Sequence, residues 1–303
     1  MFRKYTFTIL GGDKRQVVIA KKLIACGHTV RIYGLGELSV EIPGAELFCG
    51  HEKAIEGSDV IILPLPATKD NVFLYFRCDP SGIQLRLSEI ISLAAKGGCR
   101  AILGGMLPAD VIASAELKGI CAVDYYKDEA LQRKNALPSA EGALMIAMEN
   151  TEKVIKGMST VVCGYGRIGS CLSNILYGMG ANVTVMARRD EILCEAALNG
   201  YKSVRIKQDE PSEMISCLEK CDVIFNTVPH VIFSRRIIEK LKHKPLYIEI
   251  ASSPGGIDTL VARELGIQTV FAPSLPGKYA PISAGEYIFE TIFDILVQKG
   301  IMI

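Results

Sequence analysis

The stretch VVCGYGRIGSCLSNILYGMGANVTVMARR, residues 161–189, carries the pattern that decides the fold of this chain. An apolar run is followed by Gly164, Gly166 and Gly169 as G-x-G-x-x-G, then by a helical pattern and a second apolar run. Such a triplet alone is a weak signal, but one that follows a strand and opens a helix is typical of a dinucleotide-binding fold. We therefore predict a β-α-β unit whose glycine loop binds a dinucleotide.

The glycines of such a loop have separate roles, although the alternative is that they serve only a turn. Gly164 makes the tight turn, Gly166 lets the backbone approach a pyrophosphate, and Gly169 lets the helix pack closely on the strand. The phosphates then lie at a helix N-terminus, where N–H groups are free and the helix dipole is positive. The predicted pyrophosphate-binding residues are Gly164, Tyr165, Gly166, Arg167, Ile168 and Gly169.

The end of the second strand bears on the choice of cofactor. An acid at this position hydrogen-bonds the ribose of NAD and repels a 2′-phosphate, but here the strand runs into Ala187, Arg188 and Arg189. Guanidinium groups can pair with a phosphate through two hydrogen bonds, so we predict NADP. The alternative is that both arginines are solvated, with Asp190 or Glu191 contacting the ribose.

Two later strand ends are further candidates for cofactor contact. Asn226, Thr227, Val228 and Pro229 follow the strand pattern of CDVIFNTV, where a loop normally passes the nicotinamide side of such a site. The segment ASSPGG, residues 251–256, ends the next strand in the same way.

The rest of the chain repeats the alternation of short apolar runs and helical patterns, which is typical of α/β folds with parallel sheets. The first series has strand patterns at residues 5–10, 28–34, 59–66, 99–105 and 120–126, and the second has them at 159–163, 182–187, 202–206, 221–228, 245–251 and 266–272. We therefore expect two Rossmann-like parallel-sheet domains. The first would comprise residues 1–137, with substrate and catalytic roles, and the NADP-binding domain residues 158–282.

Two helices complete the expected architecture. A long interdomain helix is predicted at residues 138–157, with Pro138 at its start, Ser139 as its cap and Gly157 at its end. The segment 283–303 has apolar residues at helical spacing, and we expect it to return to the first domain.

Composition argues against several functions. The 303 residues carry a net charge of +1, which predicts no nucleic-acid face and no membrane-binding patch. No apolar run has transmembrane length, and the N-terminus shows no signal peptide, so we expect a cytoplasmic protein. The ten cysteines form no zinc-ligand pattern; we predict no metal site and expect buried, reduced thiols.

Six segments in order resemble one family. They are ILGGDKRQ, ILPLPAT, NALPSAEGAL, FNTVP, IEIASSPGGID and SLPGKYAPISAGE, and together they resemble the dipicolinate synthase A subunit of endospore-forming bacteria, over essentially the whole chain. The glycine triplet is shared with many dehydrogenases, whereas GGDKRQ and LPGKYAP are far more specific.

The resemblance implies a reaction and a partner. The product of dihydrodipicolinate synthase, a hydroxylated tetrahydropyridine dicarboxylate, would lose water, and oxidation by NADP+ would then make the ring aromatic, giving dipicolinate. The resemblance also implies a flavoprotein-like B subunit of dipicolinate synthase and synthesis in the mother-cell cytoplasm during sporulation. It leaves a homo-oligomer open.

A substrate with two carboxylates needs cations or N–H donors at its crevice. The predicted substrate-binding residues are Asp13, Lys14, Arg15, Thr68, Glu141 and Lys278. Lys14 and Arg15 could instead be ordinary first-turn residues behind an Asp13 cap, Glu141 could satisfy a helix N-terminus, and Lys278 could be a surface lysine on a turn.

Two residues are candidates for proton transfer. Lys278 would lie on a loop facing the crevice, and His230 follows the NTVP segment near the expected nicotinamide.

Two other functions stay open. One is a dehydrogenase for another small acid, although the Arg, Glu and His set of the hydroxyacid type is not clearly present. The other is a nucleotide-binding subunit that is inactive without its partner, because binding a cofactor does not prove catalysis.

Overall fold

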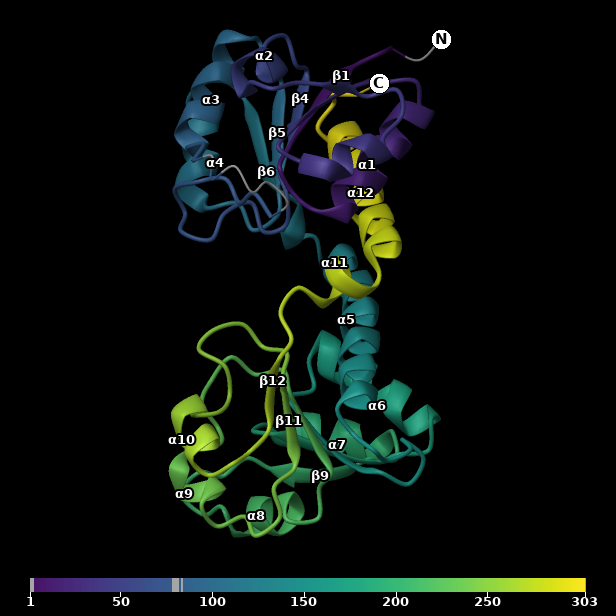
Figure 1. Cartoon of the computed structure of the whole chain (residues 1–303), viewed down its shortest axis with the longest axis vertical. Helices are drawn as coiled ribbons and strands as arrows, with labels where there is room; N and C mark the ends of the chain where they lie inside the picture. The colour runs from purple at the N-terminus through teal and green to yellow at the C-terminus, as the bar shows by residue number, and fades with distance from the viewer. Residues whose placement is uncertain (1–2, 78–81, 83, 303) are drawn as a thin grey trace. The chain divides into compact units, whose positions relative to one another are not determined.

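The computed structural model describes residues 3–77, 82 and 84–302 and divides into two compact units. Unit 1 comprises residues 1–134 and 280–303, and unit 2 residues 135–279. Each unit holds one six-stranded parallel sheet between layers of helices, so the predicted α/β class is confirmed (Figure 1).

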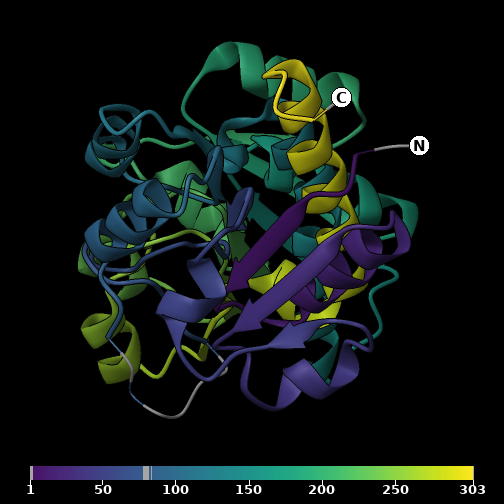
Figure 2. The ribbon, with the colours of Figure 1, turned by 90° about the horizontal axis from the view of Figure 1, so that it is seen from above.

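The sheet of unit 1 has the strand order β3-β2-β1-β4-β5-β6. Its strands are β1 (Thr6–Leu10), β2 (Thr29–Tyr33), β3 (Glu46–Leu47), β4 (Val60–Ile62), β5 (Ala101–Gly104) and β6 (Cys121–Asp124). Figure 2 shows β1 and β2 as neighbouring arrows that run in one direction. The order reverses between β1 and β4, and ligands of open α/β sheets bind outside the carboxyl ends of the strands at such a point.

Helices cover both faces of this sheet because most of its strands are apolar on both sides. The helices are α1 (Lys14–Ala25), α2 (His51–Ile55), α3 (Leu87–Lys96), α4 (Ala109–Glu116) and α12 (Pro281–Gln298), with the short 3-10 helices η1 (Gly36–Glu41) and η2 (Tyr125–Lys127). One core cluster joins α1 and α12 to the sheet, and another joins α2, α3 and α4 (Figure 1).

The predicted return of the C-terminal helix is confirmed. α12 starts at Pro281, two residues before the expected start, because a proline fits the first turn of a helix. It packs on α1, where a Cβ on Gly285 would lie 2.7 Å from Cβ of Val18. Glycine therefore allows the two helices to approach closely.

The sheet of unit 2 has the order β12-β11-β10-β7-β8-β9 and reverses between β7 and β10. Its strands are β7 (Ser159–Cys163), β8 (Asn182–Ala187), β9 (Lys202–Arg205), β10 (Val223–Asn226), β11 (Leu246–Glu249) and β12 (Thr269–Phe271). Its helices, besides part of α5 (Glu129–Glu149), are α6 (Arg167–Gly178), α7 (Asp190–Leu198), α8 (Ser212–Leu218), α9 (Arg235–Ile238), α10 (Thr259–Glu264) and α11 (Leu275–Tyr279).

The prediction of a helix at residues 138–157 is wrong in its bounds. α5 starts at Glu129 and ends at Glu149, so Pro138 lies inside it and Ser139 donates to the carbonyl of Asn135 instead of capping it. The residues before Pro138 favour helix, and they carry the helix through a proline that removes only one backbone hydrogen bond. Glu141 therefore does not lie at a helix N-terminus.

The structure contains one strand that was not predicted and one helix where a loop was predicted. β3 was not predicted, because it has only two residues and both are exposed. The segment of Lys278, predicted as a loop, forms the short helix α11.

The prediction for the cysteines is partly wrong. The described cysteines are free, and Cys99, Cys163 and Cys221 are buried in the sheets or beside them. Cys26 and Cys194, however, are exposed, as is Cys49; Cys78 lies outside the described residues. Among the described residues, no helix is long and apolar enough to cross a membrane.

Candidate functional site

The N-terminus of α6 in unit 2 is open. Gly166 is its N-cap and makes no side-chain cap hydrogen bond, and a Cβ on Gly166 would have no atom within 4 Å. Amide groups of the first helical turn lack partners within the helix, so they can bind an anion that approaches here.

The other two glycines of the triplet are required by close contacts. A Cβ on Gly169 would lie 2.2 Å from the carbonyl oxygen of Gly164, so the first turn of α6 passes directly against the loop. Gly164 has φ +90°, and a Cβ there would lie 2.4 Å from Oγ1 of Thr227. These contacts leave no room for a side chain, whereas Gly166 faces open space.

A pocket of about 500 Å³ lies over this helix N-terminus. Of the predicted cofactor residues it brings together Gly164, Tyr165, Gly166, Arg188, Arg189 and Val228, and it adds Ala187, Ile192 and Ile206. Arg167 and Ile168, with Gly169, lie in the first turn of α6 and do not line it. A second pocket of about 590 Å³ shares Arg188, Ile206 and Val228 with the first.

The second pocket is lined by charged residues of both signs, and its acids are Asp209 and Glu210. Arg205, the last residue of β9, and Lys207 line it together with Arg188. Nη1 of Arg205 donates to the carbonyl oxygen of Arg188 at 3.2 Å, and Nη2 forms an ion pair with Asp190. Asp190 is therefore engaged by an arginine, which counts against the alternative in which it contacts a ribose.

His230 also lines this pocket and is exposed. The pocket combines residues that follow β8 and β9 with Val228, His230 and Ile232, which follow β10. The place of His230 beside the nicotinamide rests on its position after β10 and stays a prediction.

The residues after β10 are held by internal contacts. Asn226 is fully buried, and its side chain bonds both the N–H and the carbonyl of Val228. Oγ1 of Thr227 donates to the carbonyl of Cys163 at 2.9 Å, which ties the β10 end to the β7 end, and Pro229 is exposed. The loop is therefore a rigid side of the site.

Unit 1 has the same strand order but a closed helix N-terminus. Asp13 is the N-cap of α1: its carboxylate accepts from the N–H of Arg15 at 3.0 Å, while Gln16 Oε1 accepts from the N–H of Asp13. This capping box confirms the alternative in which Asp13 caps the helix. A phosphate cannot take this place, because a carboxylate already fills it.

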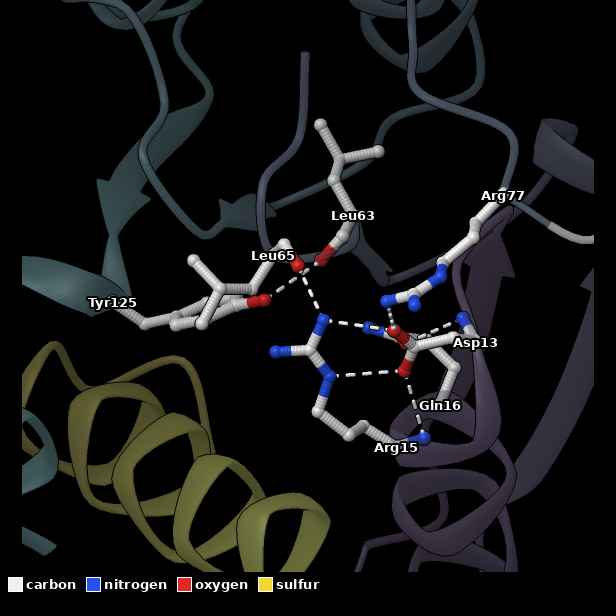
Figure 3. A network of polar contacts seen from close by, with 7 residues as sticks. All are labelled: Asp13, Arg15, Gln16, Leu63, Leu65, Arg77 and Tyr125. Carbon is white, nitrogen blue, oxygen red and sulfur yellow. Dashed lines mark hydrogen bonds and ion pairs between the residues drawn. The ribbon is translucent and has the colours of Figure 1, made fainter. Parts of the chain in front are cut away.

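Arg15 does not point to solvent but folds back on the cap (Figure 3). Its Nε and Nη2 each donate to the Asp13 carboxylate at 2.9 Å, and Nη2 also reaches the carbonyl of Leu65 at 2.5 Å. Asp13 and Arg15 are only 5% and 4% exposed. The pair thus links the ends of β1 and β4, where the strand order reverses.

Arg77 adds a second guanidinium to the same carboxylate, at 3.2 Å from Oδ2 (Figure 3). Burial alone would raise the pKa of Asp13, but the hydrogen bonds and charge of Arg15, with the charge of Arg77, outweigh it and lower this pKa. The pKa of Arg15 is raised because Asp13 outweighs the effect of burial. One carboxylate between two guanidinium groups leaves one positive charge at this strand end.

The other predicted substrate residues have surroundings of their own in the two units. Lys14 is exposed on the first turn of α1, and Thr68 is buried but bonds Asp70 at 3.0 Å. Glu141 is exposed on α5. Lys278 is exposed on α11 with Nζ 4.7 Å from the ring centre of Tyr279.

One group of potential metal ligands lies within the described residues. His51, Glu52 and Glu89 have ligand atoms within 4.8 Å of one another. His51 Nε2 already contacts Glu89 at 2.9 Å, so the cluster is satisfied as a surface ion pair.

Several site residues were not predicted. Arg77 follows no recognisable motif, and no neighbouring residue in the sequence indicates that it belongs to a site. Arg205 ends a predicted strand on the ligand side, so its position could have been a signal. Glu249, which accepts a hydrogen bond from Asn226, is an acid within an apolar strand pattern, and that is unusual enough to be noticed.

The chain was compared with known proteins. The family model described as the N-terminal domain of the dipicolinate synthase A subunit matches residues 6–126. The dipicolinate synthase A subunit of Bacillus subtilis (strain 168) is 27% identical over 290 residues, which cover 96% of this chain and 95% of that protein.

Solved structures agree with this. The dipicolinate synthase A subunit from Bacillus halodurans has a TM-score of 0.83 and 26% identity, with 98% of this chain and 99% of that chain covered. D-lactate dehydrogenase from Escherichia coli has a TM-score of 0.60 at 13% identity, covering 97% of each chain, and shows the fold alone. The predicted resemblance is therefore confirmed: the chain is similar to the dipicolinate synthase A subunit over nearly its whole length, and its fold is dehydrogenase-like.

Proposed function

We propose that this protein uses NADP+ to oxidise dihydrodipicolinate to dipicolinate. The observation that carries the proposal is the contrast between two sheets of the same strand order. In unit 1 the helix after the first strand is capped by its own carboxylate, and in unit 2 the corresponding helix N-terminus is open beneath a pocket. A dinucleotide therefore fits unit 2, which leaves unit 1 for the substrate.

The basic groups beside the pocket favour NADP over NAD. Arg188 and Arg189 are exposed at the end of β8, Arg205 contacts the backbone of Arg188, and the strand ends in the neutral Ala187. The acid next to these arginines in the sequence, Asp190, is paired with Arg205, which reduces its repulsion of a 2′-phosphate. These residues would hold the phosphate through charge-assisted hydrogen bonds.

Unit 1 supports a dicarboxylate substrate through the Asp13, Arg15 and Arg77 network. Asp13 neutralises one guanidinium, and the excess positive charge favours a substrate carboxylate at this strand end. Arg77 is the better candidate for direct contact, because its side chain is 32% exposed and makes one ion pair with Asp13. We assign Arg15 the role of holding Asp13 and, through Leu65, the end of β4. Lys14, Thr68, Glu141 and Lys278 remain candidates for further contacts.

The reaction balances without an additional oxidant. The hydroxylated tetrahydropyridine dicarboxylate loses water to give dihydrodipicolinate, which then loses a hydride and a proton to give the aromatic pyridine. NADP+ supplies the hydride acceptor when bound. Since aromatisation drives the oxidation, the chain needs only to orient the ring and to remove the proton, for which Lys278, His230 or a water would serve.

The relatives are named as one subunit of an enzyme, which supports a second protein in the active complex. We propose the flavoprotein-like B subunit of dipicolinate synthase as that partner, and the mother-cell cytoplasm during sporulation as the place of synthesis. A homo-oligomer is an alternative assembly, which light scattering of the purified chain would detect by its mass.

The test mixes the purified chain with NADP+ and freshly made product of dihydrodipicolinate synthase, with and without the B subunit. NADPH absorbance and pyridine absorbance are followed together, and the same mixture with NAD+ is the control. Both signals should rise in equal amounts, and faster with NADP+.

Each other outcome identifies a different error. Signals that appear only with the B subunit would mean that the chain is inactive without its partner. NADP binding without turnover in any mixture would disprove the substrate and leave the nucleotide site. Equal rates with NAD+ would disprove the role of the arginines.

A further inference from the structure

Glu249 is the last residue of β11 and is only 3% exposed, yet among the described residues no cation lies within ion-pair distance of it. Four neutral donors surround it instead. Oε1 accepts from Asn226 Nδ2 at 2.7 Å and from the N–H of Ala251 at 3.2 Å. Oε2 accepts from the Tyr247 hydroxyl at 2.9 Å and from the N–H of Gly256 at 2.7 Å. A buried carboxylate costs free energy, so its four bonds suggest a role beyond filling space.

Tyr247 lies within β11, and the other three donors lie at the end of β10 or in the segment after β11. Asn226 ends β10 and bonds the backbone of Val228 on both sides, so Glu249 fixes the segment 226–228 through one side chain. Ala251 and Gly256 lie on the segment after β11, which Glu249 fixes through backbone N–H groups. One carboxylate therefore sets the positions of both strand ends.

The two glycines of the second segment are shaped around this carboxylate. Gly255 has φ +80°, and a Cβ there would lie 2.8 Å from Oε2 of Glu249. A Cβ on Gly256 would lie 2.3 Å from Nδ2 of Asn226 and 2.8 Å from the Tyr247 hydroxyl. The segment is thus built to bring its backbone within hydrogen-bond distance of Glu249.

The segment 251–256 lies on the side of the reversal point opposite to β8 and β9, whereas Val228 of the other segment also lines the pocket of Arg188. β10 and β11 stand on one side of β7, and β8 and β9, which end in Ala187 and Arg205, stand on the other. A dinucleotide lies across such a point, with its adenosine half over β7 and β8 and its nicotinamide half over the β10 side.

We propose that Glu249 is a positioning residue that fixes the nicotinamide side of the cofactor site by holding the segments 226–228 and 251–256. The proposal rests on the dinucleotide site of the proposed function. Replacing Glu249 by Gln keeps the size of the side chain but turns one acceptor oxygen into a donor. That NH2 group faces two of the four donors, and the segments move apart. The adenosine half is affected less, because the β7 and β8 ends hold it and Val228 is its one contact with these segments.

The test compares two probes that share the adenosine half. NADPH carries the whole dinucleotide, and adenosine 2′,5′-bisphosphate carries only the adenosine half with the 2′-phosphate. In Glu249→Gln the Kd for NADPH should rise about tenfold or more, while the Kd for the bisphosphate stays within about twofold of that of the parent. Glu239→Gln is the control, because Glu239 is an exposed glutamate of the same unit.

The other outcomes distinguish a failure of the proposal for Glu249 from a failure of the proposed function. Unchanged NADPH binding by a folded Glu249→Gln protein would overturn the proposal, and so would an equal loss of both probes. If the parent protein binds neither probe, the proposed function fails. Should Glu249→Gln not fold, Asn226→Ala removes the link between Glu249 and Val228 and leaves the bonds of Glu249 to Tyr247, Ala251 and Gly256. It should show the same selective loss of NADPH, and normal NADPH binding by that variant would also overturn the proposal.

Discussion

The guanidinium of Arg15 and the carboxylate of Asp13 form a two-point ion pair, with Nε to Oδ1 and Nη2 to Oδ2 both 2.9 Å. The same carboxylate caps α1 and accepts from Arg77. A single acid therefore holds a helix start, a buried arginine and a more exposed one, so its removal should affect all three.

Asp13→Asn should lower the free energy of unfolding at pH 7 by about 3 kcal/mol, because it leaves a buried guanidinium without its counter-charge. Urea denaturation followed by circular dichroism measures this. Asp110→Asn is the control, since Asp110 is an exposed acid in the first turn of α4. Equal stability of both variants would show that the ion pair contributes little.

The stability of the parent protein should depend on pH through the same group. The pKa of Asp13 is lowered in the folded protein, so its contribution is complete above the unfolded pKa of about 3.9 and is lost as the pH falls through the folded pKa. The difference in stability between the parent and Asp13→Asn should therefore shrink at acid pH. Urea midpoints from neutral to acid pH measure it, and a difference that does not vary with pH would contradict the assignment.

Arg188→Asp should shift the nucleotide preference toward NAD. The substitution removes a cation from the pocket beside α6 and introduces repulsion of a 2′-phosphate, so the Kd for NADPH should rise about tenfold to a hundredfold while that for NADH changes little or falls. Fluorescence titration with both nucleotides measures this. Arg263→Asp, an exposed change on α10, controls for net charge, and an unchanged preference would exclude Arg188 as the phosphate contact.

Alanine substitutions at Gly166 and Gly169 should affect different properties: the first should weaken NADPH binding, and the second should lower stability. Gly166→Ala adds a methyl group to open space, so stability should stay unchanged while NADPH binding weakens, because the group lies where a pyrophosphate approaches. Gly169→Ala places Cβ 2.2 Å from the carbonyl oxygen of Gly164 and should cost about 1–3 kcal/mol of stability. Thermal unfolding and nucleotide titration of both variants measure this. The reverse order of effects would contradict the geometry.

Lys278→Met tests whether Lys278 of α11 binds the substrate or takes up its proton. The side chain is exposed, so the substitution should leave Tm and NADPH binding unchanged. If Lys278 contacts the substrate, kcat/KM for the dicarboxylate should fall about tenfold or more in the assay described above. Lys240→Met is the control, because Lys240 is an exposed lysine of the same unit. Full activity of Lys278→Met would show that Lys278 has no part in the reaction.

The sequence alone determined the class of fold and located the glycine loop of unit 2 at which we propose that a nucleotide binds. Alternating apolar runs and helical patterns predict parallel sheets, because a buried strand or helix face shows directly in the order of residues. The glycine triplet and the arginines after β8 are likewise local, since each lies within one β-α-β unit. Prediction from local patterns failed at α5, because Pro138 resembles the first residue of a helix but lies inside one. It also failed at β3, because the two exposed residues of this strand form no apolar run.

Only the tertiary structure decided which distant residues meet. Arg77 lies 64 positions from Asp13, and Glu249 lies 23 from Asn226, so no spacing rule could pair them. The structure also shows that Arg15 pairs with the capping Asp13, and that His230 lines a pocket together with Arg188 and Arg205. Such pairings depend on the strand order, which brings the ends of non-consecutive strands together and is not written in any single segment.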